Sequence, residues 1–367
     1  MRSCLAKNHV FALPFNRGEV AAVEYSDETR LCSSPMVSVI TTTYLHEKYL
    51  SQAIEGVLAQ QKNFEIELII GEDCSPDGTL KIALDYQRRH PDIVRVVTSE
   101  ANVGARQNGY RCGKLCRGRY VAFCDGDDYW HDPKKLQKQV EYLETHPECG
   151  LVFTNADTVE VAGGKRVPCA IPYFPALCDS DDPYLQQLTG AWIIWPVTVC
   201  LRRELREEVI RDCFEATDPR YLMGDTQRYL EYARRTSFCY MPVSTATRQL
   251  LPESTTRSQD VGRKGRFVAS QTELILHYLE KYPIPERYDR QVRRWIMLRE
   301  LEFAFRCRDA KRAAIAYSSL CERSIPVSWR YRLYYHGALN SFSRLFANSV
   351  FCGMNSALAV RRVISHR

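Results

Sequence analysis

Four short apolar segments alternate with helical patterns between residues 37 and 124. The first, Val37 to Thr43 (VSVITTT), is almost entirely β-branched, which is typical of a strand buried on both faces. Further strands are expected at Phe64 to Gly71, Ile93 to Thr98 and Tyr120 to Cys124. Apolar residues recur at helical spacing in the intervening segments, as in Tyr49 to Gln60. This alternation predicts right-handed βαβ units, and therefore an α/β fold with a mainly parallel sheet flanked by helices.

Polar residues follow three of these expected strands. Thr43 and Tyr44 end the first, Asp73 follows the second, and an acidic run from Asp125 to Asp128 follows the fourth. In open α/β sheets, ligands bind beyond the carboxyl ends of the strands. We therefore expect these polar groups to converge on one edge of the sheet.

The acidic run contains Asp125, Asp127 and Asp128 in the sequence CDGDDYWHDP. Three carboxylates packed together would repel each other by several kcal/mol without a compensating cation. Oxygen ligands on an open turn suit Mg²⁺ or Mn²⁺, which keep waters and also bind substrate phosphates. The alternative is a solvated acidic turn that caps a helix beginning near Asp132 and Pro133.

The segment after this run has weaker signals. A helix is expected at Lys134 to Thr145, and strands at Gly150 to Thr154, Trp192 to Leu201 and Phe238 to Met241. The stretch 155–190 is rich in Gly, Pro and Asp, and Gly163-Gly164 fits a hairpin turn, so we expect loops there that contact an acceptor.

Asp225 precedes an expected helix from Thr226 to Arg235. It is either a functional carboxylate or simply the N-cap of that helix. Arg248 follows the last expected strand and precedes Leu250 to Arg257 (LLPESTTR), which has the composition of a mobile loop.

We divide the chain into a peripheral leader at residues 1–35, an α/β domain at 36–260 and an all-helical, basic C-terminal extension at 261–367. Helices are expected at Phe267 to Lys281, Arg287 to Arg306, Ala310 to Cys321 and Ser328 to Leu345. No acidic residue follows Glu322, and the arginines after it alternate with aromatic residues. This tail is either a membrane-contact surface or a terminal helix pair with solvated arginines.

Composition narrows the class of protein further. The net charge of +6 is too small for a dedicated nucleic-acid binder. The 15 cysteines are scattered, with Cys112 and Cys116 the closest pair, which indicates buried thiols in a reducing compartment rather than a zinc site. The N-terminus lacks a signal-peptide pattern, and no apolar stretch has the length of a membrane span. We therefore expect a cytoplasmic protein.

Four stretches carry a resemblance to a known family. They read VSVITTTYLHEKYL at 37–50, ELIIGEDCSPDGT at 67–79, NVGARQN at 102–108 and CDGDDYWHDPKKLQKQ at 124–139. Because these four stretches occur together and in this order, the N-terminal 250 residues resemble family 2 glycosyltransferases, which are inverting enzymes with a Rossmann-like GT-A fold. They resemble particularly the bacterial members that build surface polysaccharides. The helical extension is not covered by the resemblance.

The resemblance implies roles for the residues at the strand ends. Asp73 would accept a hydrogen bond from the nucleotide base, and Thr43 and Tyr44 would line the same pocket. Asp125 and Asp127 match the D-x-D pair, the first near the ribose and the metal, the second a metal ligand, with Asp128 beside them. Mn²⁺ or Mg²⁺ would bridge the donor diphosphate and neutralise the leaving group.

Three basic or acidic positions complete the implied site. Asp225 lies about where the family has its catalytic base, which takes a proton from the acceptor hydroxyl. Arg106 and Arg248 could each contact the diphosphate, or could be surface ion-pair partners. Two departures stand out: Leu45 occupies a position that is commonly Asn in the family, and Gly224 precedes Asp225 where an acidic residue is common.

The predicted function is a metal-dependent inverting glycosyltransferase that moves a sugar from a nucleotide sugar, most often a UDP-sugar in this family, to a glycan or polyprenyl-linked acceptor. It would act in surface-polysaccharide synthesis, in the cytoplasm or peripherally at the inner face of the membrane. A sugar nucleotidyltransferase is less favoured, because Thr41 to Tyr44 lacks the glycines of a phosphate loop. A dehydrogenase would need G-x-G-x-x-G after the first strand. A catalytically degenerate sugar-nucleotide-binding or scaffold protein is the non-enzymatic alternative, and the retained Asp set argues against it.

Overall fold

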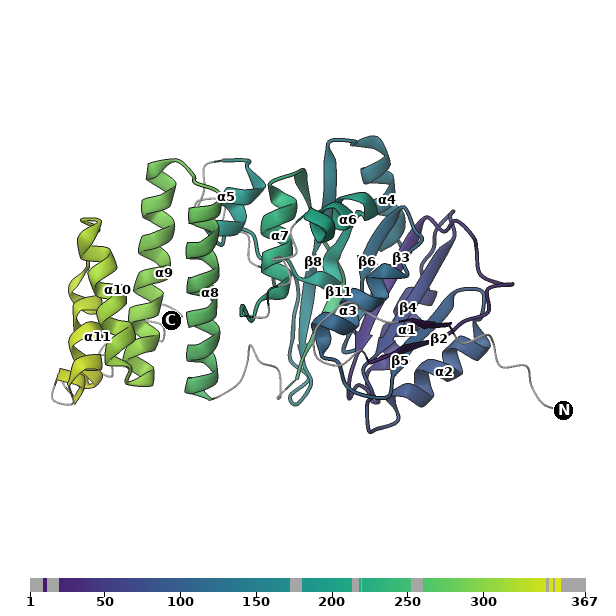
Figure 1. Cartoon of the computed structure of the whole chain (residues 1–367), viewed down its shortest axis with the longest axis horizontal. Coiled ribbons are helices and arrows are strands. Elements are labelled where there is room, and N and C mark those ends of the chain that lie inside the picture. The colour runs from purple at the N-terminus through teal and green to yellow at the C-terminus, as the bar shows by residue number, and fades with distance from the viewer. Residues whose placement is uncertain are drawn as a thin grey trace, which may run out of the picture. The chain divides into compact units, whose positions relative to one another are not determined.

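The computed structural model describes residues 9–11, 20–171, 180–212, 218, 220–251, 260–340, 343–345 and 347–350. The chain forms two compact units (Figure 1). Met1–Asp218 with Gly224–Leu251 form the first, and Pro219–Met223 with Pro252–Arg367 form the second. The loop expected at 250–257 lies largely outside the described residues.

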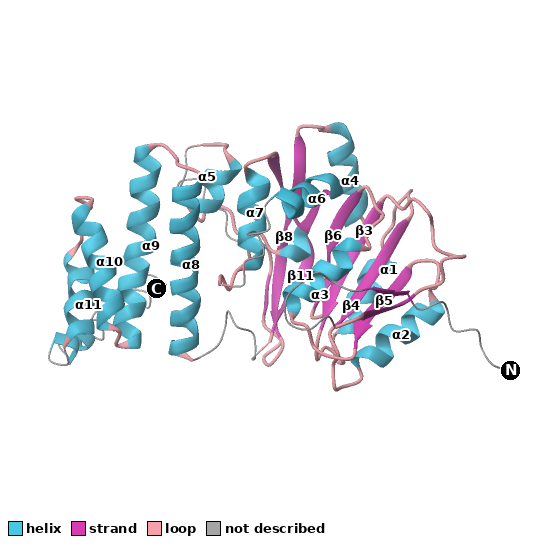
Figure 2. Cartoon of the chain, in the orientation of Figure 1, coloured by secondary structure: helices cyan, strands magenta, loops and turns pink. Residues whose placement is uncertain are grey.

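Parallel strands form the centre of the first unit, in the order β5-β4-β3-β6. The strands are β3 (Val37–Thr43), β4 (Ile66–Glu72), β5 (Val94–Ser99) and β6 (Tyr120–Phe123). The connecting helices are α1 (Leu50–Leu58), α2 (Thr79–Arg89) and α3 (Ala105–Lys114). Every residue of β4 and of β5 is buried, as the apolar sequence runs predict for strands covered on both faces. The expected α/β architecture is confirmed (Figure 2).

Beyond β6 the sheet becomes mixed. The added strands, in spatial order, are β10 (Val199–Arg202), β8 (Cys149–Glu160), β11 (Ser237–Leu250) and β7 (Asp128–Trp130). β10 is antiparallel to β6 and β8, β11 is parallel to β8, and β7 is antiparallel to β11. The helices of this region are α4 (Lys135–Thr145), α5 (Pro183–Leu188), α6 (Arg203–Asp212) and α7 (Gly224–Ala233).

Several of these elements differ from those that the local sequence predicts. The strand expected from Trp192 is wrong in its first half, because Pro196 begins the 3₁₀ helix η2 (Pro196–Thr198) and β10 starts only at Val199. β8 and β11 are much longer than expected, since each pairs with the other over most of its length. The hairpin turn at Gly163-Gly164 is confirmed and leads into β9 (Arg166–Val167).

The residues before position 36 add strands to the sheet, although their sequence shows no periodicity. β2 (Ala22–Tyr25) pairs with β5, and β1 (His9–Phe11) pairs with β2. The buried Arg95 ties β2 to the parallel core, because its guanidinium pairs with Glu24 and with Glu67, both at 2.7 Å. Burial acts to raise the pKa of Glu67, but the Arg95 charge and several hydrogen bonds hold it below its usual value.

We expect Arg95→Met to lower the free energy of unfolding by about 3–5 kcal/mol, because it leaves the buried Glu24 without a cation and leaves Glu67 only its pair with Arg117. The measurement is chemical denaturation monitored by circular dichroism. Arg88→Met is the matched control, since Arg88 forms an exposed pair with Asp85 and its loss should change stability by no more than about 0.5 kcal/mol. Equal effects of the two substitutions would show that the buried network contributes little.

The second unit is helical in the residues that the structure describes. Its helices are α8 (Val261–Lys281), α9 (Glu286–Cys307), α10 (Ala310–Glu322) and α11 (Trp329–Leu339). Asp260 and Asp309 cap α8 and α10 by accepting backbone N–H groups, at 2.8 Å from Gly262 and 3.0 Å from Arg312. α11 ends earlier than expected, at Leu339, and the backbone of the following Asn340 is extended. No described helix is long and apolar enough to cross a membrane.

Candidate active site

The ends of β3, β4 and β6 are joined by hydrogen bonds at the carboxyl edge of the parallel strands. The Thr42 hydroxyl donates to Asp125 Oδ1 at 2.5 Å, and the Gly126 N–H donates to the Thr42 carbonyl at 2.9 Å. The Asp73 N–H donates to the Thr43 carbonyl at 3.1 Å. The structure therefore brings together the polar groups that follow the three strands in the sequence.

The three acids after β6 form a tight turn that leads directly into β7. The Asp128 N–H donates to the Asp125 carbonyl at 2.9 Å, and Asp128 Oδ1 accepts the Gln249 N–H at 3.0 Å. Burial, reinforced by the Asp127 charge, raises the pKa of Asp125 to about 7. The same two causes raise the pKa of Asp128 well above its usual value. Crowded carboxylates of this kind are stabilised in their charged form by a cation.

The donor set of this turn fits a hard divalent cation only in part. The described residues contain no group of three His, Cys, Asp or Glu side chains that could hold a metal alone. Mg²⁺ and Mn²⁺ commonly bind through one or two carboxylates plus substrate phosphates and water. Asp125 and Asp127 fit that role, and the remaining ligands would come from the substrate.

Gly126, between the two acids, lies against two side chains from the end of β3. A Cβ on Gly126 would come within 2.6 Å of Thr43 Oγ1 and 2.8 Å of His46 Nδ1. Both of these atoms are buried and have no hydrogen-bond partner among the described residues. Burial lowers the pKa of His46, while the charges of Asp127 and Asp77 oppose this. Thr43 and His46 therefore pack closely against the turn, and the charge of Asp127 acts on His46.

We expect Gly126→Ala to lower the free energy of unfolding by about 1–3 kcal/mol, because the added methyl must displace Thr43 or His46. It should also weaken nucleotide binding by displacing Asp125 and Asp127. The measurements are thermal unfolding and calorimetric titration with UDP and Mn²⁺.

Gly109→Ala is the matched control, because Gly109 lies on α3 and its Cβ would have Thr42 Cγ2 at 3.8 Å as its nearest neighbour. A helix-interior alanine at an open position should be neutral or slightly stabilising. If Gly126→Ala behaves like Gly109→Ala, the close contacts at Gly126 do not constrain the turn.

Asp73 is buried and already has a structural role. Its two carboxylate oxygens accept the N–H groups of Val103 at 2.8 Å and Gly104 at 2.9 Å, while Asn102 Nδ2 donates to its carbonyl at 3.0 Å. Asp73 thus fixes the loop of the NVG sequence that leads into α3. Each carboxylate oxygen of Asp73 has a second lone pair. Asp73 could therefore accept the hydrogen bond from a nucleotide base that the resemblance implies and keep its bonds to Val103 and Gly104.

Leu45 has a left-handed backbone conformation, with φ at 60°. Leucine is strained in this region, which asparagine tolerates far better. This geometry gives a physical reason for the Asn that the family commonly has at this position. The neighbouring Tyr44 side chain is 41% exposed and therefore accessible to a ligand.

Asp225 lies in the first turn of α7 and is about half exposed. It forms an ion pair with Arg228 one helical turn later. The pKa of Asp125 is raised mainly by burial and by the charge of Asp127, and the charge of Asp225 adds to this effect. Asp225 therefore interacts electrostatically with the acidic turn. The helix begins at Gly224, so Asp225 is within the first turn and is not the N-cap residue.

Arg106, near the start of α3, packs against the same turn of α7. Its Nη1 donates to the Asp218 carbonyl at 2.6 Å, and its Cζ lies 3.6 Å from the position that a Cβ on Gly224 would occupy. Burial lowers the pKa of Arg106, and the nearby Arg228 charge acts in the same direction. An acidic side chain at position 224 would therefore lie beside a guanidinium, which accounts for the acid that is common there in the family.

Arg248 lies in β11 directly opposite Asp128 of β7. Its guanidinium covers the Trp195 ring, with Cζ 5.1 Å from the ring centroid. The sequence predicts Arg248 as a site residue but gives no signal for Trp195, which lies in the segment expected to be a strand. His46 and Arg228 were also missed, although the i,i+3 spacing of Asp225 and Arg228 is recognisable in the sequence.

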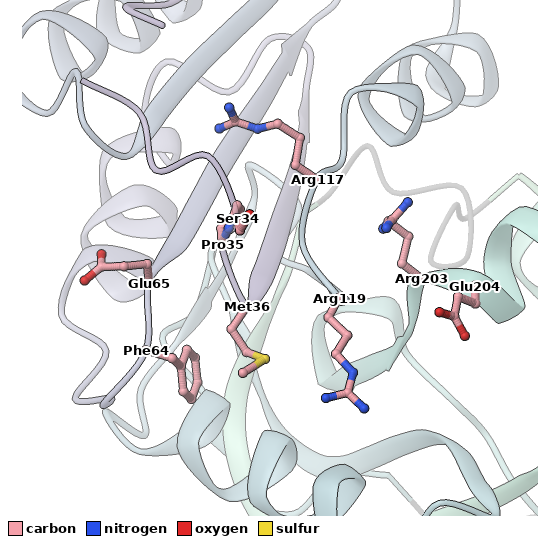
Figure 3. Close-up of a pocket in the computed structure, with 9 residues that line it drawn as sticks. All are labelled: Ser34, Pro35, Met36, Phe64, Glu65, Arg117, Arg119, Arg203 and Glu204. Atoms are coloured by element: carbon pink, nitrogen blue, oxygen red, sulfur yellow. The ribbon is translucent and has the colours of Figure 1, made fainter. Parts of the chain in front are cut away.

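The described residues also line a cavity of 390 Å³ at the opposite edge of the sheet. It lies at the amino ends of β3, β4 and β6, and its lining includes Met36, Phe64, Arg117, Arg119 and Arg203 (Figure 3). Each of these arginines pairs with a carboxylate, namely Glu67 at 2.8 Å, Glu144 at 2.8 Å and Glu207 at 2.6 Å. This cavity is separate from the acidic turn and lacks an unpaired cation for a phosphate.

Comparisons with known proteins agree with the geometry. Residues 38–209 match the family model described as glycosyl transferase family 2. An uncharacterised protein of Mycobacterium tuberculosis (strain ATCC 25618 / H37Rv) is 38% identical over 168 residues, which are 46% of this chain and 47% of that protein. EpsE of Bacillus subtilis (strain 168), named as a glycosyltransferase, is 36% identical over 155 residues, which are 41% of this chain and 54% of EpsE. The chain spans about half the length of the curated relatives it matches.

Solved structures share the fold at low sequence identity. TarS residues 1–349 of S. aureus, in complex with UDP-GlcNAc, has a TM-score of 0.53 and 18% identity, covering 83% of this chain and 80% of that one. The mannosyltransferase PcManGT of Pyrobaculum calidifontis, in complex with GDP-Man and Mn²⁺, has a TM-score of 0.51 and 16% identity, covering 86% and 84%. These similarities confirm the expected GT-A fold.

Proposed function

We propose that this chain, whose residues 38–209 match the model of glycosyl transferase family 2, is a metal-dependent inverting enzyme that transfers a sugar from a nucleotide sugar to a glycan or lipid-linked acceptor. One observation carries this proposal. Asp125 and Asp127 lie at the carboxyl edge of the parallel strands and share their electrostatic environment with Asp225 of α7. The acidic turn and the candidate base are therefore close enough for the charge of Asp225 to act on Asp125.

The nucleotide would occupy the ends of β3 and β4. Asp73 would accept a hydrogen bond from the base through its remaining lone pairs, and the exposed Tyr44 would line the pocket beside Thr43. A UDP-sugar is the first donor class to test, since TarS was solved with UDP-GlcNAc and has the same fold. Arg106, on which the charge of Asp225 acts, would contact the diphosphate.

Asp125 and Asp127 would hold Mn²⁺ or Mg²⁺ together with the donor phosphates. The metal, when bound, would supply Lewis-acid and electrostatic stabilisation of the leaving nucleoside diphosphate. PcManGT, which has this fold, was solved with Mn²⁺. The raised pKa of Asp125 is consistent with this role, because that carboxylate is poorly stabilised in its charged form without a cation.

Asp225 would accept the proton of the acceptor hydroxyl while that oxygen attacks the anomeric carbon. The attack would come from the face opposite the leaving group, so a single displacement inverts the configuration. Arg228 pairs with Oδ1 of Asp225, whose side chain is about half exposed. The base would therefore be oriented before the acceptor binds.

The acceptor would be a growing surface glycan, as the name of the related teichuronic acid biosynthesis glycosyltransferase TuaG of Bacillus subtilis suggests. We propose a lipid-linked acceptor at the inner face of the cell membrane. The second unit offers a contact for such a surface, since Trp329 is 56% exposed on α11, which also carries Arg330 and Arg332, and Ile315 is 60% exposed on α10.

The test is a calorimetric titration of the purified protein with UDP, GDP and other nucleoside diphosphates, each with and without Mn²⁺. Binding of one nucleotide only when Mn²⁺ is present would support the donor site and identify its base. Nucleotide binding without detectable sugar transfer would favour the alternative that the chain is a catalytically degenerate sugar-nucleotide-binding or scaffold protein. Formation of a nucleotide sugar from a sugar phosphate and a nucleoside triphosphate would favour the nucleotidyltransferase.

A further inference from the structure

Arg248 and Trp195 form a pair of side chains beside the acidic turn. Directly opposite residues of an antiparallel ladder point to the same face of the sheet, so Arg248 shares a face with Asp128. The charge of Arg248 opposes the raised pKa of Asp128, which burial and the charges of Asp127 and Asp125 cause. The indole of Trp195 packs against the core of the sheet and supports the guanidinium above it.

Arg248 forms no salt bridge within the described part of the chain, although Asp128 lies near enough for the two charges to interact. It forms no hydrogen bond there either, and Asp128 Oδ1 accepts the Gln249 N–H instead. Other arginines of this region are neutralised, as Arg166 pairs with Asp157 and Arg228 pairs with Asp225. A partly buried guanidinium that covers an indole and donates no hydrogen bond to a carboxylate is suited to recognise an anionic ligand.

The position of Arg248 in the sheet indicates which part of the substrates it meets. The expected nucleotide pocket lies at β3 and β4, whereas β11 and β7 lie on the opposite side of β6 in the strand order. A donor with its base at β4 and its diphosphate at the acidic turn would direct its sugar toward β11. Arg248 and Trp195 would then contact the transferred sugar or the acceptor sugar beside it.

We propose that Arg248 and Trp195 bind the carboxylate of an acidic sugar, so that one of the two sugars joined by this protein is a hexuronate. This inference rests on the proposed glycosyl transfer. One guanidinium offers a single positive charge and two parallel N–H donors, which match a carboxylate. A dianionic phosphate monoester would require further cations, and the nearby acids of the turn provide none.

The first experiment compares UDP-glucuronate with UDP-glucose in calorimetric titrations of the full chain with Mn²⁺. A hexuronate donor should bind about 10- to 100-fold more tightly than the neutral donor, as one charge-assisted bidentate pair implies. Arg248→Met should bind the two donors with equal affinity, and Arg248→Lys should retain part of the preference for the hexuronate donor. Arg211→Met, on the exposed end of α6, is the matched control for the loss of one positive charge and should retain the full ratio.

The second experiment separates the donor from the acceptor as the source of the carboxylate. Neutral oligosaccharides and hexuronate-containing ones are offered together with the donor that binds, and the products are identified by mass spectrometry. Products formed only on the acidic oligosaccharides, and lost in Arg248→Met, assign the carboxylate to the acceptor.

Three outcomes would overturn the inference. The first is equal use of neutral and acidic sugars in both experiments, and the second is discrimination that persists in Arg248→Met. The third is a preference for phosphorylated sugars over hexuronates. In all three cases UDP would still bind with Mn²⁺, so the proposed function would stand. Failure of UDP and every other nucleoside diphosphate to bind would instead overturn the proposed function, and this inference with it.

Discussion

Asp127→Asn should reduce the Mn²⁺-dependent affinity for the nucleoside diphosphate by about 100-fold or more, because a neutral amide replaces a charged metal ligand. Stability should be unchanged or higher. The Asp127 charge raises the pKa of both Asp125 and Asp128, so its removal relieves repulsion within the turn. Calorimetric titration with and without Mn²⁺ measures the first effect, and thermal unfolding without metal measures the second.

Asp85→Asn is the matched control for this substitution. Asp85 is an exposed acid on α2 that pairs with Arg88 and Arg89, so its change should alter neither nucleotide affinity nor stability by a measurable amount. Unchanged Mn²⁺-dependent affinity in Asp127→Asn would remove Asp127 from the metal site. A large loss of stability would mean that its carboxylate has a structural partner.

The second large effect concerns the candidate base. Asp225→Asn should lower the rate of sugar transfer by about 10²- to 10⁴-fold, because the amide cannot accept the proton of the attacking hydroxyl. Donor binding should change by less than about threefold, since the residues proposed to hold the nucleotide and its diphosphate are unaltered. Release of nucleoside diphosphate under saturating donor measures the rate, and calorimetry measures the binding.

Arg228→Met separates proton transfer from the ion pair. This substitution breaks the same Asp225–Arg228 pair but leaves the carboxylate in place. If the two variants lose transfer equally, the defect of Asp225→Asn is due to the broken ion pair. An active Asp225→Asn enzyme would leave this residue with a structural role in the first turn of α7.

Much of the first unit was predictable because its signals are local. The β-branched run of β3 and the apolar runs of β4, β5 and β6 alternate with helical periodicity, so the parallel core and the edge carrying Asp73 and Asp125 followed from the sequence. The longer strands β8 and β11 did not, because each is extended by pairing with the other. β2 also lacked a local signal, since its pairing with β5 and the buried Arg95 define it.

The features of the candidate site also fall into those that the sequence predicts and those that only the folded structure shows. The identity of its acids and the likeness of the NVG and D-x-D stretches to one family could be recognised from residues alone. The contacts of Gly126 with Thr43 and His46 could not, because they join the ends of two strands that lie far apart in the sequence. The stacking of Arg248 on Trp195 is of the same kind, and it depends on η2 placing Trp195 beside β11.

The sequence by itself determined the α/β class, the order of the polar clusters along the chain and the candidate residues for metal binding and proton transfer. Periodicity and residue chemistry are properties of short segments, and they persist whatever the chain packs against. Only the tertiary structure decided that Asp125 is buried with a pKa near 7, that Asp225 is held by Arg228 and that Arg248 forms no salt bridge among the described residues. These properties depend on burial and on distances between remote segments, which exist only once the chain is folded.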